Sequence, residues 1–229
     1  MRGDSPLRAP EPRLSYQIRR SARARRVRVS VDATGGVEVV LPRGAPQRSA
    51  DAAVHELRPW IERRLREVAR TQATIAARSG TVPYLGRDLT LVAQAGRARV
   101  HRRGDQLLVP DGAGRLEALE RWYRRAAREE VTWRLDDACA AVGLRYSALT
   151  IRGQRTRWAS CSRAGAMSFN WRLLLAPAAV LDYVVWHEVC HLKVMDHSPR
   201  FWAMVAAHCP GYREQVRWLR RHGPTLVLA

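Results

Sequence analysis

The sequence predicts an α+β fold, in which a β-rich N-terminal subdomain with one helix is followed by a mainly helical domain. In the first part, polar and apolar residues alternate along short segments separated by glycines, which is typical of half-buried strands. In the second part, apolar residues recur every three or four positions over long segments, which is typical of helices with one buried face. We place these parts at residues 14–110 and 111–229, after a proline-rich segment, 1–13, that we expect to be a flexible tail.

The N-terminal part is expected to begin with a β-hairpin over residues 14–42. Polar and apolar residues alternate over 25–31, Thr34-Gly35-Gly36 has the composition of a turn, and residues 37–41 read as the return strand. Pro42 ends this strand, because proline cannot donate a hydrogen bond to a neighbouring strand.

A helix and further strands complete the N-terminal part. The apolar residues over 49–70 have helical spacing, and Pro59 predicts a kink or a break there. Two or three short strands are expected over 84–109, with turns at Gly96 and Gly104.

The C-terminal part opens with a long helix over residues 116–142. Gly143 closes it, because glycine readily takes the left-handed conformation that ends many helices. Two strands are expected next, over 146–152 and 166–171.

Three helices are expected in the last third of the chain. Pro177 suits the first turn of a helix that runs to about Met195. Ser198-Pro199 resembles a helix cap followed by proline at the first helical position, so a second helix begins there. Pro210-Gly211 ends it, and the last helix covers 212–222.

The chain is strongly basic, with 40 Lys+Arg against 21 Asp+Glu and a formal net charge of +19. Its 46% hydrophobic content excludes a wholly disordered chain. A bias in genome composition explains why nearly all the cations are arginine, but not why cations exceed anions almost twofold. The excess is densest in the first 30 residues, which hold 9 arginines. This Arg-rich N-terminal region favours an anionic partner such as nucleic acid.

Neither a membrane nor a secretory location is expected. The longest apolar run, 173–181, is far shorter than the roughly 20 residues that a membrane-spanning helix needs. The N-terminal residues lack the apolar core of a signal peptide, and the four cysteines form no CxxC pair. We therefore expect a cytoplasmic protein; the sequence predicts no oligomeric state.

The motif that carries chemistry is His187-Glu188-Val189-Cys190-His191, within the helix predicted from Pro177. Residues four apart lie on one face of a helix, so the two imidazoles can converge on one zinc ion. Glu188 then lies beside the metal, where it can take a proton from a water molecule. Random placement gives roughly 0.01 such matches in a chain of this composition. A surface helix would explain the match without a metal, but the apolar residues before it favour a buried helix.

Zinc hydrolases usually add a third protein ligand and leave a fourth position for water. Four residues after the motif are candidates: Asp196, His197, His208 and Glu214. Nitrogen ligands suit zinc, and the turn before Ser198 can return a side chain towards the helix. This spacing favours His197, with Asp196 as an alternative ligand or as an acceptor that orients an imidazole.

Four ordered motifs resemble the YgjP-like metal-dependent hydrolases, which are grouped with the SprT-like and WLM metalloproteases. They lie at 157–162 (RWASCS), 168–173 (SFNWRL), 181–192 (LDYVVWHEVCHL) and 197–202 (HSPRFW). The resemblance is dense over 152–222. Ala159 stands where the family usually has glycine, and Val189 where it usually has leucine; neither position is a proposed ligand.

The resemblance implies that residues 111–229 form a zincin-like (minimal metallopeptidase) catalytic domain with Zn²⁺ as its cofactor. It implies that His187, His191 and His197 are the zinc ligands and that Glu188 is the catalytic base. The implied substrate is a peptide or protein, in related groups one that is bound to DNA.

Substrate-binding residues are harder to predict. In zincin-like folds the strand before the active-site helix borders the cleft, so Ser168, Asn170 and Trp171 are candidates for an edge that pairs with an extended peptide. Simple packing explains these residues equally well. Tyr212 is a candidate for substrate binding, and Tyr212, Arg200 and His208 are candidates for stabilising the oxyanion.

Two other functions compete with a zinc peptidase. One is a metal-dependent hydrolase of a nucleotide or another phosphorylated small molecule, although the sequence lacks the carboxylate clusters that magnesium sites prefer. The other is a nucleic-acid-binding protein with a structural zinc, although such a site normally has a fourth Cys or His ligand.

Overall fold

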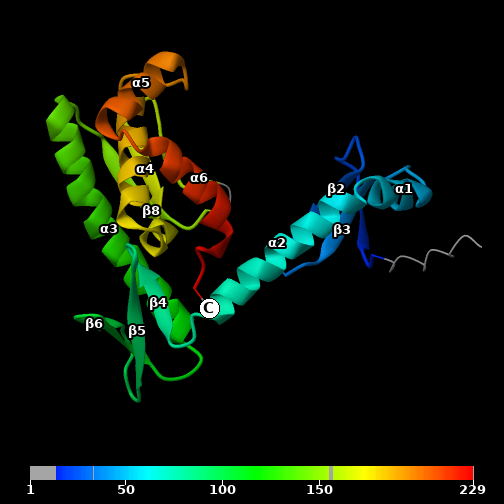
Figure 1. Cartoon of the computed structure of the whole chain (residues 1–229), viewed down its shortest axis with the longest axis horizontal. Coiled ribbons are helices and arrows are strands. Elements are labelled where there is room, and N and C mark those ends of the chain that lie inside the picture. Colours follow the sequence, from blue (N-terminus) through cyan, green and yellow to red (C-terminus); the bar gives the residue numbers. More distant parts are fainter. Residues whose placement is uncertain (1–13, 33, 155–156, 229) are drawn as a thin grey trace, which may run out of the picture. The chain divides into compact units, whose positions relative to one another are not determined.

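The computed structural model describes residues 14–32, 34–154 and 157–228, so the tail predicted at 1–13 lies outside the described residues. The fold is mixed α+β, as predicted (Figure 1). The chain divides into two compact units, residues 1–73 and 74–229. Within the part that the structure describes, no helix is both long and apolar enough to cross a membrane.

The first unit contains a three-stranded sheet in the order β1-β3-β2. Strand β2 (Arg28–Val31) and β3 (Val37–Pro42) form the predicted antiparallel hairpin. The Asp32 carboxylate accepts hydrogen bonds from the backbone N–H groups of Thr34 and Gly36, both at 2.8 Å, and so holds the turn. Strand β1 (Gln17–Ser21) pairs in parallel with β3 and was not predicted, because its sequence QIRRS offers one apolar position.

The predicted helix over 49–70 is two helices in the structure, α1 (Arg48–Glu56) and α2 (Arg58–Ala76). The break falls at Leu57, so that Pro59 lies in the first turn of α2, where its missing N–H is not needed. The core of the first unit joins β3, α1 and the start of α2 through buried residues: Val37, Val39, Leu41, Ala50, Val54 and Ile61.

The second unit begins with a four-stranded sheet in the order β4-β5-β7-β6. Its strands are β4 (Thr81–Tyr84), β5 (Arg87–Gln94), β6 (His101–Arg103) and β7 (Gln106–Pro110). This sheet shares one core with the C-terminal helices, so the compact units divide before β4, whereas the sequence analysis placed the boundary after residue 110.

The turn between β4 and β5 was also not predicted. It uses Leu85 at a φ of 50° and Gly86 at 89°. The left-handed conformation at a leucine is unusual, so residue type gives little warning of it.

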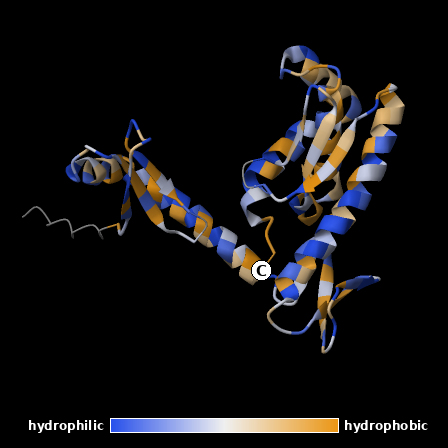
Figure 2. Ribbon diagram, turned by 180° about the vertical axis from the view of Figure 1, so that it is seen from behind, coloured by the Kyte–Doolittle hydropathy of each residue, from blue (hydrophilic) through white to orange (hydrophobic). Residues whose placement is uncertain are grey.

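The long helix α3 (Arg115–Val142) ends at Gly143, which takes the left-handed conformation (φ 65°) as predicted. Apolar and hydrophilic residues alternate along α3 in Figure 2, as expected for a helix with one buried face. A second sheet follows, with β8 (Ala148–Arg152), β9 (Ala159–Cys161) and β10 (Ala166–Asn170) in the order β8-β10-β9. Strand β10 is therefore central.

A 3₁₀ turn, Trp171–Leu175, leads into α4 (Ala178–His191), which is followed by α5 (Pro199–His208), α6 (Tyr212–His222) and a short 3₁₀ turn, Gly223–Thr225. Helix α4 ends at His191, so the prediction that it continues to about Met195 was wrong. The chain turns after His191, where the Val194 N–H donates to the Cys190 carbonyl at 3.0 Å. This earlier end leaves the residues up to Ser198 free to fold back.

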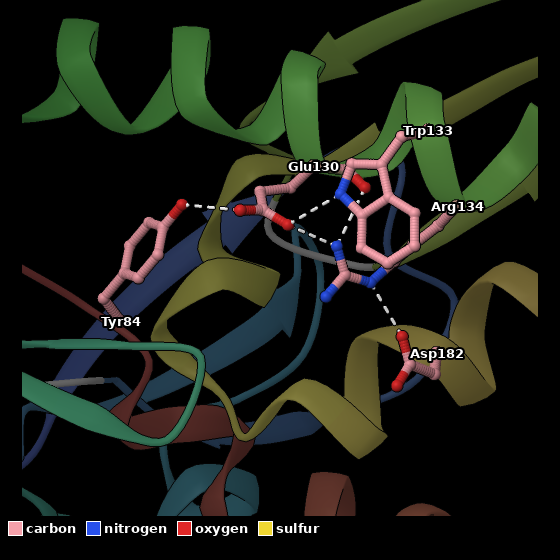
Figure 3. Close-up of polar contacts among 5 residues, drawn as sticks. All are labelled: Tyr84, Glu130, Trp133, Arg134 and Asp182. Atoms are coloured by element: carbon pink, nitrogen blue, oxygen red, sulfur yellow. Dashed lines mark hydrogen bonds and ion pairs between the residues drawn. The ribbon is translucent and has the colours of Figure 1, made fainter.

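Arg134 joins three elements of the second unit (Figure 3). It lies on α3 and is only 9% exposed; its Nε donates to Asp182 of α4 at 2.7 Å, and its guanidinium donates to Glu130. Tyr84 of β4 donates to the same Glu130 carboxylate at 2.9 Å. Burial raises the pKa of Glu130, but hydrogen bonds from Arg134, Trp133 and Tyr84 outweigh it and hold the pKa below its usual value. Glu130 is therefore an ionised carboxylate at neutral pH.

Candidate metal centre

Helix α4 brings two histidines of the HExxH motif together. Val180, Leu181, Val184 and Val185 of this helix are buried, and α4 contacts α3, α5, α6 and β9 within the second unit (Figure 1). His187 and His191 are one turn apart, and their Nε2 atoms lie 3.2 Å from each other. This is the shared face that the spacing predicted.

His197 reaches the same point from the turn between α4 and α5. Its Nε2 lies 3.1 Å from Nε2 of His187, and the ligand atoms of the three histidines all lie within 4.8 Å of one another. In a tetrahedral zinc site, Zn–N distances of about 2.0–2.1 Å place neighbouring nitrogens about 3.3 Å apart. The separations from His187 fit three nitrogens around one ion.

Contacts at Nδ1, the ring nitrogen that does not face the cluster, orient two of the imidazoles. Nδ1 of His191 lies 3.0 Å from the Val194 carbonyl oxygen, and Nδ1 of His187 lies 3.4 Å from the Tyr183 hydroxyl. Contacts at Nδ1 leave Nε2 as the nitrogen that faces the centre, which is the usual arrangement around protein-bound metals. The buried ring of Phe201 stacks on His191 with a centroid distance of 4.4 Å, which restricts the imidazole further.

The other candidates for the third ligand lie elsewhere. Asp196 accepts a hydrogen bond from the Ser198 backbone N–H at 2.9 Å rather than from an imidazole. His208 stacks on Trp186, with ring centroids 4.2 Å apart, and Glu214 is exposed in the first turn of α6. Among the described residues, the cluster contains only the three histidines.

The protonation of the histidines suits a metal. Burial lowers the pKa of His187 to about 3, and the neighbouring His191 and His197 act in the same direction. Burial also lowers the pKa of His191. Both imidazoles are therefore neutral at neutral pH, which is the form that binds a metal ion.

Glu188 is buried beside this cluster, with 5% of its surface exposed. Burial raises the pKa of its carboxyl to about 8, although Arg157 and the backbone N–H of Cys161 act in the opposite direction. Its Oε2 atom is buried and has no hydrogen-bond partner among the described residues. A buried carboxyl group without a partner is costly, so this oxygen is available to a water molecule or a substrate.

A family model for the YgjP-like metallopeptidase domain matches residues 25–222, most of the chain. The chain belongs to the YgjP-like family. It is therefore a metallopeptidase, a metal-dependent enzyme that acts on peptides or proteins. This agrees with the family that the four motifs indicated.

One solved structure similar to this YgjP-like chain is the crystal structure of the metallopeptidase zymogen of Pyrococcus abyssi abylysin. The identity is 26%, over 40% of this chain and 93% of that chain, with a TM-score of 0.36. No curated relative matches the chain.

The prediction that residues 166–171 form a free edge for pairing with a substrate peptide was wrong. Strand β10 pairs with β8 on one side and β9 on the other, so it has no open edge. Ser168, Asn170 and Trp171 are buried. The Ser168 hydroxyl lies 3.0 Å from that of Ser160, and the Asn170 amide donates to the Gln154 carbonyl at 2.7 Å. These contacts support the alternative that the segment is packed inside the YgjP-like domain.

Tyr212 is linked to the histidine cluster through the ring of Trp202. It is half-buried and stacks on Trp202 at a centroid distance of 5.3 Å, and Trp202 in turn contacts the rings of His187 and His197. Sequence analysis missed Tyr183, which lies four residues before His187 on the same helix face. That spacing is the signal that could have identified it.

Proposed function

We propose that this YgjP-like protein is a zinc-dependent peptidase in which Glu188 is the general base. One observation carries the proposal: three imidazole Nε2 atoms converge beside a buried carboxyl group that has an unpartnered oxygen. His187, His191 and His197 would hold the ion. Three imidazole nitrogen donors suit zinc, whereas magnesium and calcium prefer oxygen donors.

When bound, zinc would polarise the scissile carbonyl group and make a water molecule easier to deprotonate. Glu188 would accept the proton of that water at its free Oε2 and return it to the leaving amine. The residue is well placed to hold a proton between these steps, since burial already raises its pKa to about 8. A cation on the histidines would lower this pKa and favour the carboxylate before reaction.

We further propose that β9, rather than β10, is the strand with which an extended peptide pairs. The Trp158 carbonyl accepts a hydrogen bond from the Asn170 N–H, and the Ser162 N–H donates to the Ala166 carbonyl, both in β10. In an antiparallel ladder, Ser160 between them therefore faces β10 as well. The backbone groups of Ala159 and Cys161 therefore face away from β10. The Cys161 N–H acts on Glu188, which supports a pairing edge beside the proposed general base.

Replacing Ala159 by proline tests this edge, because proline removes the outward N–H and leaves the β9–β10 hydrogen bonds in place. We expect kcat/KM for a peptide substrate to fall by about tenfold, the effect of one lost hydrogen bond at about 1.4 kcal/mol. Ala159→Val, which keeps the N–H, is the matched control. Equal kcat/KM for the proline and valine variants would exclude β9 as the pairing edge.

The reaction class is tested with purified protein and three substrates: casein, a protein bound to DNA, and a nucleoside triphosphate. We expect the proteins to be cleaved, and a chelator to stop the cleavage until zinc is restored. Turnover of the nucleoside triphosphate alone would instead support the phosphoester hydrolase. DNA binding without turnover, unchanged by chelator, would support a structural zinc.

The DNA-bound substrate is included because of the arginines in the first unit. Arg19 pairs with Glu38, and Arg20 donates to the carbonyl groups of Arg43 and Ala45. Arg23, Arg25 and Arg26 are exposed, which leaves them accessible to phosphate groups. Faster cleavage of casein when it is tethered to DNA, abolished at high salt, is the result expected if these residues hold a nucleic acid.

A further inference from the structure

A second basic site lies in the second unit, formed by the four-stranded sheet and α3. It is a cavity of about 660 Å³ lined by Arg97, Arg99, Val100, His101, Arg121 and Arg125. Figure 1 shows the sheet beside the N-terminal part of α3. None of the described residues that line the cavity is acidic.

Among the described residues, no acidic side chain forms an ion pair with the arginines of this cavity. Other arginines of α3 have acidic partners: Arg124 pairs with Glu120 at 2.7 Å and Arg134 with Glu130. Among the described residues, Arg121 and Arg125 form no ion pair. The Arg97 side chain donates to the neutral Gln94 side chain at 2.8 Å.

Two backbone elements carry the basic residues of this cavity. On the segment 97–101, Arg97, Arg99 and His101 alternate with other residues, and the intervening Val100 is buried in the core at 6% exposure. Arg99 and His101, on either side of Val100, are both exposed. Arg121 and Arg125 lie one turn apart on one face of α3. Packing of Val100 in the core and the helical spacing on α3 therefore hold the arginines of both elements around the same cavity.

The lining identifies the chemistry of the ligand. Small-molecule pockets are mostly apolar with a few polar groups, whereas here a single valine accompanies five basic side chains. Arginine forks bind phosphate oxygens in pairs. No phenylalanine, tyrosine or tryptophan is among the described residues that line the cavity, so the arginines and their phosphate contacts dominate the recognition.

We propose that this cavity binds the phosphate backbone of nucleic acid without reading its sequence. Duplex DNA carries about one charge per 1.7 Å of its axis, whereas a peptide offers at most one carboxylate per residue, or about 3.3–3.6 Å. The denser anion matches the four clustered arginines better. The proposal is independent of the peptidase mechanism and of the N-terminal arginines.

The test measures binding of the full chain to a labelled duplex DNA by fluorescence anisotropy over a range of salt concentrations. For Arg121→Ala/Arg125→Ala we expect Kd at about 0.1 M salt to rise ten- to a hundredfold. The slope of log K against log salt should become shallower by about 1.8, which corresponds to two lost phosphate contacts. Arg99→Ala, in the segment 97–101, should make this slope shallower by about 0.9, which corresponds to one lost phosphate contact.

Two further variants separate the site from general charge and from misfolding. Arg121→Lys/Arg125→Lys keeps both charges and should keep the slope of the unmodified protein. Arg217→Ala/Arg221→Ala removes two exposed arginines at the same helical spacing on α6 and should leave the slope unchanged.

Three results would overturn the proposal. The first is an unchanged slope in both Arg121→Ala/Arg125→Ala and Arg99→Ala. The second is an equal change of slope in the α6 control. The third is displacement of DNA by poly-glutamate at equal charge concentration, which would identify the cavity as a site for an acidic peptide.

Discussion

Replacing Glu188 by glutamine is expected to lower kcat for peptide hydrolysis by roughly 10²–10⁴-fold, the usual contribution of a general acid–base group. The amide is nearly isosteric with the carboxyl group, so the buried position remains filled. It cannot accept a proton from water or return one to the leaving amine. The three histidines are untouched, so zinc content per chain should not change.

The measurement pairs metal analysis with single-turnover kinetics on the same preparation. Glu129→Gln is the matched control, because Glu129 is an exposed glutamate on α3 and its replacement should leave kcat unchanged. A Glu188→Gln protein that keeps its zinc and its full activity would show that another group acts as the base. Loss of zinc together with activity would instead mean that Glu188 supports the metal site.

Replacing His191 by alanine is expected to reduce bound zinc from about one ion per chain to near zero and to abolish hydrolysis. A site with three protein ligands becomes one with two, and the remaining imidazoles must hold the ion with solvent alone. The Val194 carbonyl and the Phe201 ring, which position His191, lose their partner.

Thermal unfolding gives a readout that does not depend on activity. An ion that binds only the folded chain adds about 2.7 kcal/mol of stability when its concentration is 100 times Kd. For a chain of this size, that raises Tm by about 5–10 °C. Zinc should produce this increase in the unmodified protein and in His55→Ala, an exposed histidine on α1, but not in His191→Ala. A similar increase in all three would place the zinc outside the histidine cluster.

Much of this site could be predicted from spacing, because its parts are local in sequence. His187 and His191 are four residues apart, so helical periodicity places them on one helix face. The Ser198-Pro199 cap begins a new helix, so the chain must turn just before it, and this turn brings His197 back towards α4. The family resemblance then selected His197 over Asp196, and the geometry agrees with that choice.

The parts that were not predicted depend on contacts between distant segments. Strand β9 is three residues long and has no alternating pattern, so only its pairing with β10 reveals it. The central position of β10 likewise follows from β8, almost twenty residues earlier, and no local signal shows which strand is at the edge. The grouping of β4–β7 with α3 also comes from a shared core, since chain order alone suggested the opposite.

The polar contacts of Arg134 with Asp182 and Glu130 affect the free energy of metal binding. Asp182 is the residue before Tyr183, so the ion pair that holds α4 against α3 lies beside the residue that contacts His187. The helix is therefore fixed in position by polar contacts made on folding, before any ion arrives. Binding would order few additional side chains, so its conformational entropy cost should be small and the affinity should reflect mainly the metal–nitrogen bonds.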